Sequence, residues 1–330
     1  RQALDAAGWD GSVSFTFQGG EPTVAGLDFF RDFVKMVGEQ NTQHLPVDYS
    51  IQTNALALDG EWAEFLARNR FLTGISLDGD KDLHDAFRVD AAGKGTWNRV
   101  QKNLRLLQKA GVECNLLCVV TRRCAKSAVR IYHALQKTGV GYLQFIPCLD
   151  PLGEERGQRP WSLTPEDYGA FLCALFDEWY RDWAAGHYTS VRLFEDYVYL
   201  AMGLPAGTCA TSGSCGAYSV IEADGSVYPC DFFALDGWKL GNIHETPLAA
   251  LRDCGREQDF LQDGLRRPAP CADCRWRDLC FGGCKRDWTA GAAGVRQNYY
   301  CEAFRRFFAH AEPRLRQIAA AEQRARRMGL

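Results

Sequence analysis

The sequence predicts an α/β protein in which a parallel sheet is followed by a smaller cysteine-rich domain. In the first half of the 330-residue chain, apolar and β-branched runs alternate with segments of helical periodicity. In the second half this alternation stops, and eight of the 14 cysteines fall into two tight groups. Alternating β and α units are typical of a parallel sheet covered by its connecting helices.

Five strands are predicted in the first half, with helices between them. The strands span 12–17, 47–53, 71–77, 112–120 and 140–147, and the helices span 24–39, 60–69, 95–110 and 125–138. A sixth strand is expected at 188–194, after a helix at 164–184 whose start is marked by Thr164-Pro165-Glu166. Ligands of such sheets bind at the carboxyl ends of the strands, which makes the residues after each strand candidates for a site.

A second domain is expected from residue 189 onward, which leaves residues 1–188 as the first domain. Short hairpin strands at 217–222 and 226–229 flank the turn Ala223-Asp224-Gly225, and cysteine-rich loops follow. An arginine-rich helix near 302–327 closes the chain, and we interpret its basic side chains as a solvated face.

Composition excludes two classes of partner. A formal net charge of −3 and a pI near 6.1 lack the basic excess of a general nucleic-acid binder. No apolar run approaches the roughly 20 residues that a membrane-spanning helix needs, and no secretory signal opens the chain. We therefore expect a soluble, cytoplasmic protein with no nucleic-acid or membrane partner.

Two cysteine patterns carry the strongest chemical signal. They are Cys209-x5-Cys215-x14-Cys230 and Cys271-x2-Cys274-x5-Cys280-x3-Cys284-x16-Cys301. Eight thiolates can complete two four-ligand sites, which hold structural zinc or iron–sulfur clusters. Phe281-Gly282-Gly283 favours clusters, because glycines let backbone amides approach thiolate sulfurs. A zinc-ribbon binding protein remains the alternative, and Cys254 is left outside both groups.

Seven short motifs follow one another in a specific order. They are FTFQGGEPT at 15–23, IQTN at 51–54, ISLDG at 75–79, HDAFR at 84–88, FIP at 145–147, YPCDF at 228–232 and CFGGC at 280–284. In these motifs and in its cysteine pattern, the chain resembles the anaerobic sulfatase-maturating enzymes. These are radical S-adenosylmethionine (SAM) enzymes with a C-terminal SPASM domain, and the resemblance covers nearly the whole chain.

The resemblance implies a role for each candidate site residue. Cys209, Cys215, Cys230 and Cys284 would hold one auxiliary [4Fe–4S] cluster, and Cys271, Cys274, Cys280 and Cys301 would hold the other. Backbone groups at Gly20 would meet the methionine ammonium of SAM, Ser76 and Arg88 would bind its carboxylate, and Leu149 would contact its nucleoside. Asp231 would be the base that acts on the substrate.

The activity implied by the resemblance is the oxidation of a Cys or Ser residue in an unfolded sulfatase polypeptide to Cα-formylglycine. A 5′-deoxyadenosyl radical would remove a hydrogen from the β-carbon, Asp231 would deprotonate the side chain, and a further electron would pass to the Cys209 group. Flavodoxin or ferredoxin would supply electrons. The alternative within enzymes is another SPASM-domain peptide modifier that forms thioether or carbon–carbon cross-links.

One departure from the family pattern affects the expected activity. Radical SAM enzymes hold a third, catalytic cluster with Cys-x3-Cys-x2-Cys, and this triplet is absent. The nearest match, Cys114-x3-Cys118-x5-Cys124, has different spacing and begins on a predicted strand. We therefore expect a partial (β/α)6 radical SAM barrel that lacks its first β/α unit and is inactive alone, the third cluster belonging to a longer protein.

Overall fold

The computed structural model describes residues 1–8, 10–290 and 294–328. They form two compact units, one of Arg1 and Ala7–Phe194 and one of Gln2–Ala6 and Glu195–Leu330. The division lies six residues beyond the expected boundary at 188/189. Within the described ranges, no helix is both long enough and apolar enough to cross a membrane.

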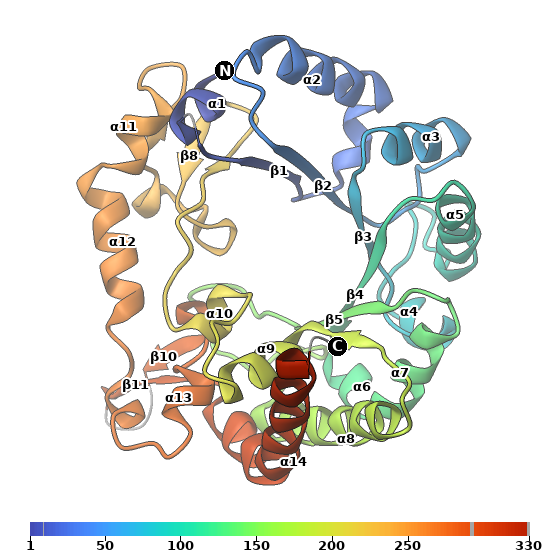
Figure 1. The fold of residues 1–330 in the computed structure, drawn as a ribbon, viewed down its shortest axis with the longest axis vertical. Helices are drawn as coiled ribbons and strands as arrows, with labels where there is room; N and C mark the ends of the chain where they lie inside the picture. The colour runs from blue at the N-terminus through green and yellow to red at the C-terminus, as the bar shows by residue number, and fades with distance from the viewer. Residues whose placement is uncertain (9, 291–293, 329–330) are drawn as a thin grey trace. The chain divides into compact units, whose positions relative to one another are not determined.

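The first unit is built on a six-stranded parallel sheet in which every strand pairs with its neighbour in sequence. The order is β1-β2-β3-β4-β5-β6, and helices lie along the outer side of the curved sheet (Figure 1). The strands are β1 (Val13–Phe17), β2 (Val47–Thr53), β3 (Leu72–Ser76), β4 (Cys114–Val120), β5 (Tyr142–Pro147) and β6 (Ser190–Val191). The predicted parallel α/β fold is confirmed, and all carboxyl ends of the strands lie at one edge.

The helices between the strands follow from capping and apolar spacing. They are η1 (Pro22–Ala25), α2 (Leu27–Gln40), α3 (Gly60–Arg68), α4 (Lys81–His84), α5 (Trp97–Lys109), α6 (Arg122–Ala125), α7 (Ala128–Gln136) and α8 (Pro165–Ala184). The Thr164 hydroxyl accepts from the Asp167 amide and caps α8, as the sequence predicted. In α5, Val100, Leu104 and Leu107 form one fully buried face.

The predicted strand at 188–194 is wrong over most of its length. Only Ser190–Val191 pair with β5, and helix α9 (Arg192–Ala201) begins at the next residue. Phe194, Tyr197 and Val198 are buried with the i, i+3, i+4 spacing of a helix. The apolar run at 188–194 was too short to show the helical period. The buried face of the helix continues past residue 194, to Tyr197 and Val198.

The second unit contains small sheets and short helices. A three-stranded sheet joins β7 (Val220–Ile221), β8 (Ser226–Tyr228) and β9 (Gly241–Asn242), and β10 (Trp288–Ala290) pairs with β11 (Arg296–Asn298). The helices are α1 (Gln2–Ala7), α10 (Cys209–Ser212), α11 (Leu248–Arg252), α12 (Gly255–Leu265), α13 (Arg277–Cys280) and α14 (Cys301–Met328), with 3-10 turns η2 (Asp231–Phe233), η3 (Asp236–Trp238), η4 (Ala269–Cys271) and η5 (Lys285–Asp287). The hairpin β7–β8 is confirmed, whereas α11 and α12 occupy a region expected to be loop.

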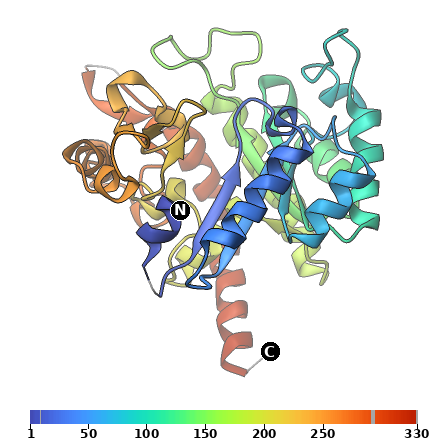
Figure 2. The same cartoon turned by 90° about the horizontal axis from the view of Figure 1, so that it is seen from above.

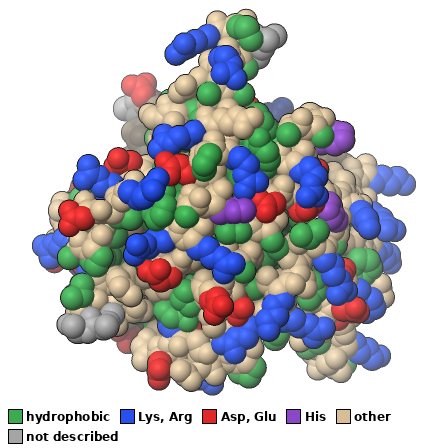
Figure 3. Space-filling view, turned by 90° about the horizontal axis from the view of Figure 1, so that it is seen from below, with side chains coloured by type: hydrophobic (Ala, Val, Ile, Leu, Met, Phe, Trp, Pro, Cys, Tyr) green, Lys and Arg blue, Asp and Glu red, His purple; other side chains and the backbone are tan. Residues whose placement is uncertain are grey.

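The closing helix is confirmed as α14, a long helix that extends away from the other elements of its unit (Figure 2). Two of its arginines pair with acidic residues on the same helix, Arg305 with Glu302 and Arg316 with Glu312. On the face drawn in Figure 3, basic side chains are interspersed with acidic and apolar ones. These observations agree with a solvated helix face.

Candidate functional site

The loop after β1 leaves the backbone of a glycine pair accessible. Gly19 and Gly20 have φ values of +89° and +52°, a region that residues with a β-carbon rarely adopt. At either position, no atom lies within 4 Å of the point where a β-carbon would be. Gly20 therefore presents its peptide groups to open space at the carboxyl end of β1.

Glu21 fixes this turn to the end of β2. Its Oε1 accepts hydrogen bonds from the Thr23 hydroxyl at 2.6 Å and from the Thr53 hydroxyl at 2.7 Å. Its Oε2 accepts from the Asn54 amide at 2.7 Å. Charge-assisted bonds of this kind are about twice as strong as neutral ones. The sequence analysis did not include Glu21 among the site residues, although its position directly after the glycine pair, which follows a predicted strand, indicated that it lies at the site.

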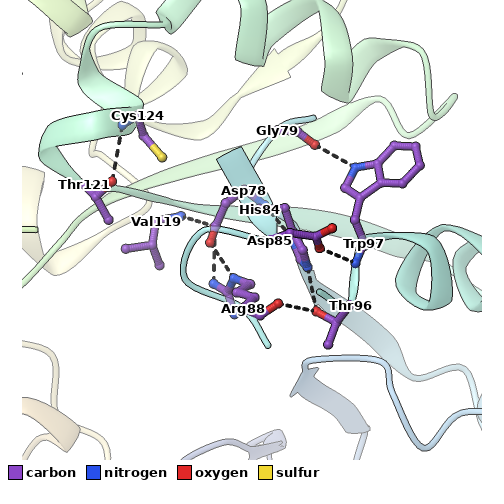
Figure 4. Close-up of polar contacts among 10 residues, drawn as sticks. All are labelled: Asp78, Gly79, His84, Asp85, Arg88, Thr96, Trp97, Val119, Thr121 and Cys124. Carbon is purple, nitrogen blue, oxygen red and sulfur yellow. Dashed lines mark hydrogen bonds and ion pairs between the residues drawn. The ribbon is translucent and has the colours of Figure 1, made fainter. Parts of the chain in front are cut away.

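Arg88 lies against a buried carboxylate that follows β3. Its Nε donates to Oδ2 of Asp78 at 2.5 Å and its Nη2 donates to Oδ1 at 3.3 Å. The Val119 amide on β4 donates to the same Oδ1 at 2.8 Å, so that Asp78 joins two strand ends to Arg88 (Figure 4). The side chain of Asp78 is 5% exposed and that of Arg88 is 25% exposed. The guanidinium is thus held in one orientation while part of it faces solvent.

His84 lies beside the Asp78–Arg88 ion pair, on its buried side. Its ring is fully buried, and burial lowers the pKa of the imidazole to about 4, so that it is neutral at neutral pH. Its Nδ1 accepts from the Asp78 amide at 3.2 Å, and its Nε2 lies 3.0 Å from the Thr96 hydroxyl. That hydroxyl in turn donates to the Arg88 carbonyl. The loop from Asp78 to Thr96 is therefore closed by hydrogen bonds on both sides of Arg88 (Figure 4).

The two other residues expected at SAM lie at strand ends of the same sheet. Ser76 is the last residue of β3, and Leu149 follows β5 by two positions; both are half-buried. Gly20, Ser76, Arg88 and Leu149 thus come from segments that follow or end β1, β3 and β5 in one parallel sheet. The structure places all four in the same unit, at the carboxyl ends of its strands.

Three cysteines of the first unit, Cys114, Cys118 and Cys124, lie on a strand and a helix. Cys118 on β4 and Cys124 on α6 are buried, and burial raises the pKa of both thiols. Cys114 is also a strand residue, and burial raises the pKa of its thiol to about 11. Cys118 and Cys124 therefore belong to the buried core of the first unit.

Four cysteines of the second unit surround one cavity. The pKa of the Cys280 thiol is raised to about 12, first by burial and then by the charges of Cys271, Cys301 and Cys274. A cavity of about 450 Å³ is lined by these four cysteines together with Gly282, Asn298 and aromatic side chains. The structure therefore brings together the four residues that the resemblance assigned to one cluster.

The other four cysteines form a second group around Cys284. The pKa of the Cys284 thiol is raised to about 12 by burial, with further contributions from the charges of Asp287, Cys209 and Cys230. Cys209 also acts on the Cys215 thiol, whose pKa burial raises. Cys284 is thereby grouped with cysteines far from it in sequence. Cys254, which the sequence left outside both groups, is the N-cap residue of α12.

Glycines and backbone amides surround these sulfurs. The Gly282 amide donates to the Cys280 sulfur, and the Arg286 amide lies 3.4 Å from the Cys284 sulfur. On α12, a β-carbon at Gly264 would lie only 2.5 Å from the Cys215 sulfur. N–H···S contacts and close backbone approach are what iron–sulfur clusters require of their surroundings.

The cavity at the Cys271 group has room for a cluster. The four cysteines line it together with proline, aromatic, charged and amide side chains, and its volume is about 450 Å³. A single zinc ion holds its sulfur ligands about 2.3 Å away and needs less space than this.

Asp231 lies on the surface next to Cys230 and is held by a tyrosine. The Tyr218 hydroxyl donates to Asp231 Oδ1 at 2.8 Å and lies 3.3 Å from the Cys230 sulfur. Burial, together with hydrogen bonds to Cys230 and Asp231, raises the pKa of Tyr218, which therefore stays protonated and can donate. Sequence reasoning missed Tyr218, because its contact with Asp231 depends on how the β7–β8 hairpin folds.

Comparison with known proteins gives the same assignment across the chain. Residues 213–275 match the family SPASM, an iron-sulfur cluster-binding domain. A cysteine-type anaerobic sulfatase-maturating enzyme of Clostridium novyi is 41% identical over 298 residues, which cover 90% of this chain and 80% of that protein. A serine-type enzyme of Bacteroides thetaiotaomicron is 30% identical over 318 residues, with 91% and 76% covered.

A solved structure is also similar over nearly the full length. It is that of native anSMEcpe with bound AdoMet and Kp18Cys peptide, with a TM-score of 0.92 and 38% identity, covering 97% of this chain and 90% of that one. The parallel sheet and the cysteine-rich unit are therefore shared by a protein that holds SAM and a peptide.

The Gly264 contact gives a direct test of the Cys215 group. In Gly264→Ala the new methyl group meets the Cys215 sulfur, and we expect the reconstituted protein to lose about four irons per chain, the content of one [4Fe–4S] cluster. Gly→Ala inside a helix otherwise stabilises by roughly 1 kcal/mol, so that a weaker helix cannot explain a loss.

Gly255→Ala is the matched control, because Gly255 begins the same helix and no atom lies within 4 Å of the point where its β-carbon would be. Iron and sulfide analysis after anaerobic reconstitution measures the difference between the two variants. Full iron content in Gly264→Ala would show that Cys215 is not a cluster ligand.

Proposed function

The chain belongs to the anaerobic sulfatase-maturating enzymes, and on that premise we propose how its own residues serve the reaction. The enzyme converts a Cys or Ser residue of a sulfatase polypeptide to Cα-formylglycine, and it uses SAM and [4Fe–4S] clusters. The observation that carries the proposal is the set of eight thiols gathered into two groups of four, in a chain whose parallel sheet has a polar site at its strand ends. When bound, SAM and the clusters supply the radical that removes the β-hydrogen and the acceptor for the remaining electron.

The proposed ligands of the two auxiliary clusters are the two thiol groups. Cys209, Cys215, Cys230 and Cys284 would hold one cluster, and Cys271, Cys274, Cys280 and Cys301 would hold the other. Mutual electrostatic effects within each group support this division, as does the cavity that Cys271, Cys274, Cys280 and Cys301 line together.

The proposed SAM site lies at the strand ends of the first unit. Peptide groups at Gly20 would bind the methionine ammonium, Ser76 and Arg88 would bind the carboxylate, and Leu149 would contact the nucleoside. Arg88 is supported by its fixed orientation on Asp78, because a guanidinium that is already ordered loses less entropy when it binds a second carboxylate.

Asp231 is the proposed base for the substrate thiol or hydroxyl. Its Oδ1 is oriented by the Tyr218 hydroxyl, and its carboxylate is exposed, so that a polypeptide side chain can reach it. A base must lie within hydrogen-bond reach of the proton that it removes. The substrate is proposed to be an unfolded sulfatase segment, and flavodoxin or ferredoxin to be the electron donor.

The 330-residue chain contains no Cys-x3-Cys-x2-Cys triplet. We propose that the chain as it stands does not cleave SAM reductively, because the eight grouped thiols would be consumed by the two auxiliary clusters. The positions of Cys118 and Cys124 support this proposal, since both side chains are buried in the core of the first unit, one on β4 and one on α6.

Arg88→Lys should weaken SAM binding and leave both auxiliary clusters intact. Lysine keeps the charge but cannot hold Asp78 and the SAM carboxylate with a planar fork. The loss of one or two charged hydrogen bonds predicts a roughly tenfold to hundredfold weaker affinity by calorimetry. Arg130→Lys is the control, because Arg130 makes only exposed ion pairs with Asp80 and Asp82. An unchanged affinity in Arg88→Lys would remove Arg88 from the SAM site.

Asp231→Asn should lower formylglycine formation by about two to four orders of magnitude in the enzyme that carries all its clusters. The asparagine keeps the size of the side chain but removes the base, while SAM binding and iron content stay normal. Mass spectrometry of Cys and Ser sulfatase peptides after anaerobic incubation measures the product. Asp236→Asn, in the neighbouring turn η3, is the control. A normal yield from Asp231→Asn would exclude it as the base.

A further inference from the structure

Lys285 is a buried cation directly after the proposed ligand Cys284. Its side chain is only 2% exposed, and no other lysine among the described residues is buried. Burying an ammonium is costly unless its surroundings replace the lost hydration. The aromatic rings, thiols and carboxylates around Lys285 therefore show how its charge is stabilised and which groups it acts on.

Three aromatic rings enclose the ammonium, and we name them the aromatic box: Phe233, Trp238 and Phe260. The Lys285 Nζ lies 3.2 Å from the centre of the Phe260 ring and 5.1 Å from the centres of the other two. It also donates to the Phe260 carbonyl at 2.8 Å. The negative faces of aromatic rings stabilise a cation without neutralising it. The charge of Lys285 is thus held in place and still felt by its neighbours.

The aromatic box is built from the segments that carry the Cys209 group. Phe233 and Trp238 follow Cys230, and Phe260 lies on α12, the helix whose Gly264 meets the Cys215 sulfur. Burial lowers the pKa of Lys285, and the charges of Cys215 and Cys230 act in the opposite direction, in favour of the ammonium form. The cation therefore lies among three of the four proposed ligands.

The nearby acidic groups do not neutralise Lys285 fully. Asp263 Oδ2 is 3.5 Å from its Nζ, but both oxygens of this carboxylate also bind Arg296 at 3.1 and 3.2 Å. The charge of Lys285 also acts on Glu257, and burial raises the pKa of this carboxyl group, which favours its neutral form. Asp263 is thus shared between the two cations Lys285 and Arg296, and positive charge remains on Lys285 beside the thiols.

The other thiols, those of Cys271, Cys274, Cys280 and Cys301, have exposed cations for neighbours. The cations that act on Cys271 and Cys301 are Arg267 and Arg305. Both are exposed, and the side chain of Arg305 is 58% accessible. Solvent and salt screen exposed charges far more than buried ones. The two groups of thiols therefore differ in their electrostatic surroundings.

We propose that Lys285 raises the reduction potential of the cluster held by Cys209, Cys215, Cys230 and Cys284, which makes this cluster the better electron acceptor of the two. The inference rests on the proposed ligand assignment. Reduction would add one electron, and hence one negative charge, to the cluster that these four thiolates would hold. No atom or proton is transferred. A buried positive charge stabilises that reduced state, since charge and solvent exposure set cluster potentials. In turnover the electron comes from the substrate, which is oxidised.

The test compares Lys285→Met with Asp263→Asn in anaerobically reconstituted protein. Potentiometric titration with dithionite, followed by electron paramagnetic resonance, measures the potentials of both clusters. Lys285→Met removes the positive charge and should lower the potential of the Cys209-group cluster. Asp263→Asn removes a negative charge beside Lys285 and should raise it. The potential of the other cluster is the internal reference, and Lys239→Met is the control for loss of a lysine outside the aromatic box.

Opposite shifts confined to one cluster would support the inference. An unchanged potential in iron-replete Lys285→Met, or shifts of the same sign in both variants, would overturn it. If Lys285→Met loses iron, Asp263→Asn decides: a higher potential supports the inference and any other result overturns it. Wild-type protein that holds no cluster at the Cys209 group would overturn the ligand assignment itself, and this inference with it.

Discussion

The gathering of eight thiols into two groups is the constraint on which the second unit depends. Its described strands are short, and its buried apolar residues include a small cluster of Val227, Leu248 and Leu251 beside the hairpin and the face of α14 that carries Phe307, Phe308 and Leu315. Its thiol groups join segments that lie far apart in sequence, such as Cys209 and Cys284. Metal ligation adds to the folding free energy of such a unit, because the site does not exist in the unfolded chain. At Gly264 the Cys215 sulfur leaves no room for a side chain, and Gly282 has a φ of +84°, a conformation that residues with a β-carbon rarely adopt.

In the first unit, hydrogen bonds hold polar side chains in fixed positions at the carboxyl-terminal edge of the parallel sheet. Two carboxylates do this: Glu21 joins the ends of β1 and β2, and Asp78 joins the ends of β3 and β4 to Arg88. Neutral His84 completes the second arrangement from the buried side. Functional groups positioned by such networks need little reorganisation when a ligand binds. The site is therefore built from strand ends that the parallel topology brings to one edge.

Local signals in the sequence predicted most of the fold. The alternation of apolar runs, the Thr164 cap and the turn at Asp224-Gly225 all depend on neighbouring residues, and each is confirmed. The strand predicted at 188–194 was wrong because only two of its residues are extended and a helix begins directly after them. Helix α12 was missed because it has few apolar residues, which give only a weak helical periodicity. The Asp78–Arg88 pair, the Tyr218–Asp231 bond and the aromatic box join residues that only the folded chain brings together. The grouping of Cys284 with Cys209 came from the resemblance, since spacing alone fits other pairings.

Metal analysis of the 330-residue chain tests the central claim most directly. Anaerobic reconstitution, iron and sulfide quantification and Mössbauer spectroscopy should find about eight irons and eight sulfides per chain, all in [4Fe–4S] clusters with four thiolate ligands each. Zinc in place of iron would contradict the assignment of both groups. A content near twelve irons would show that further cysteines, such as those of the first unit, hold a third cluster.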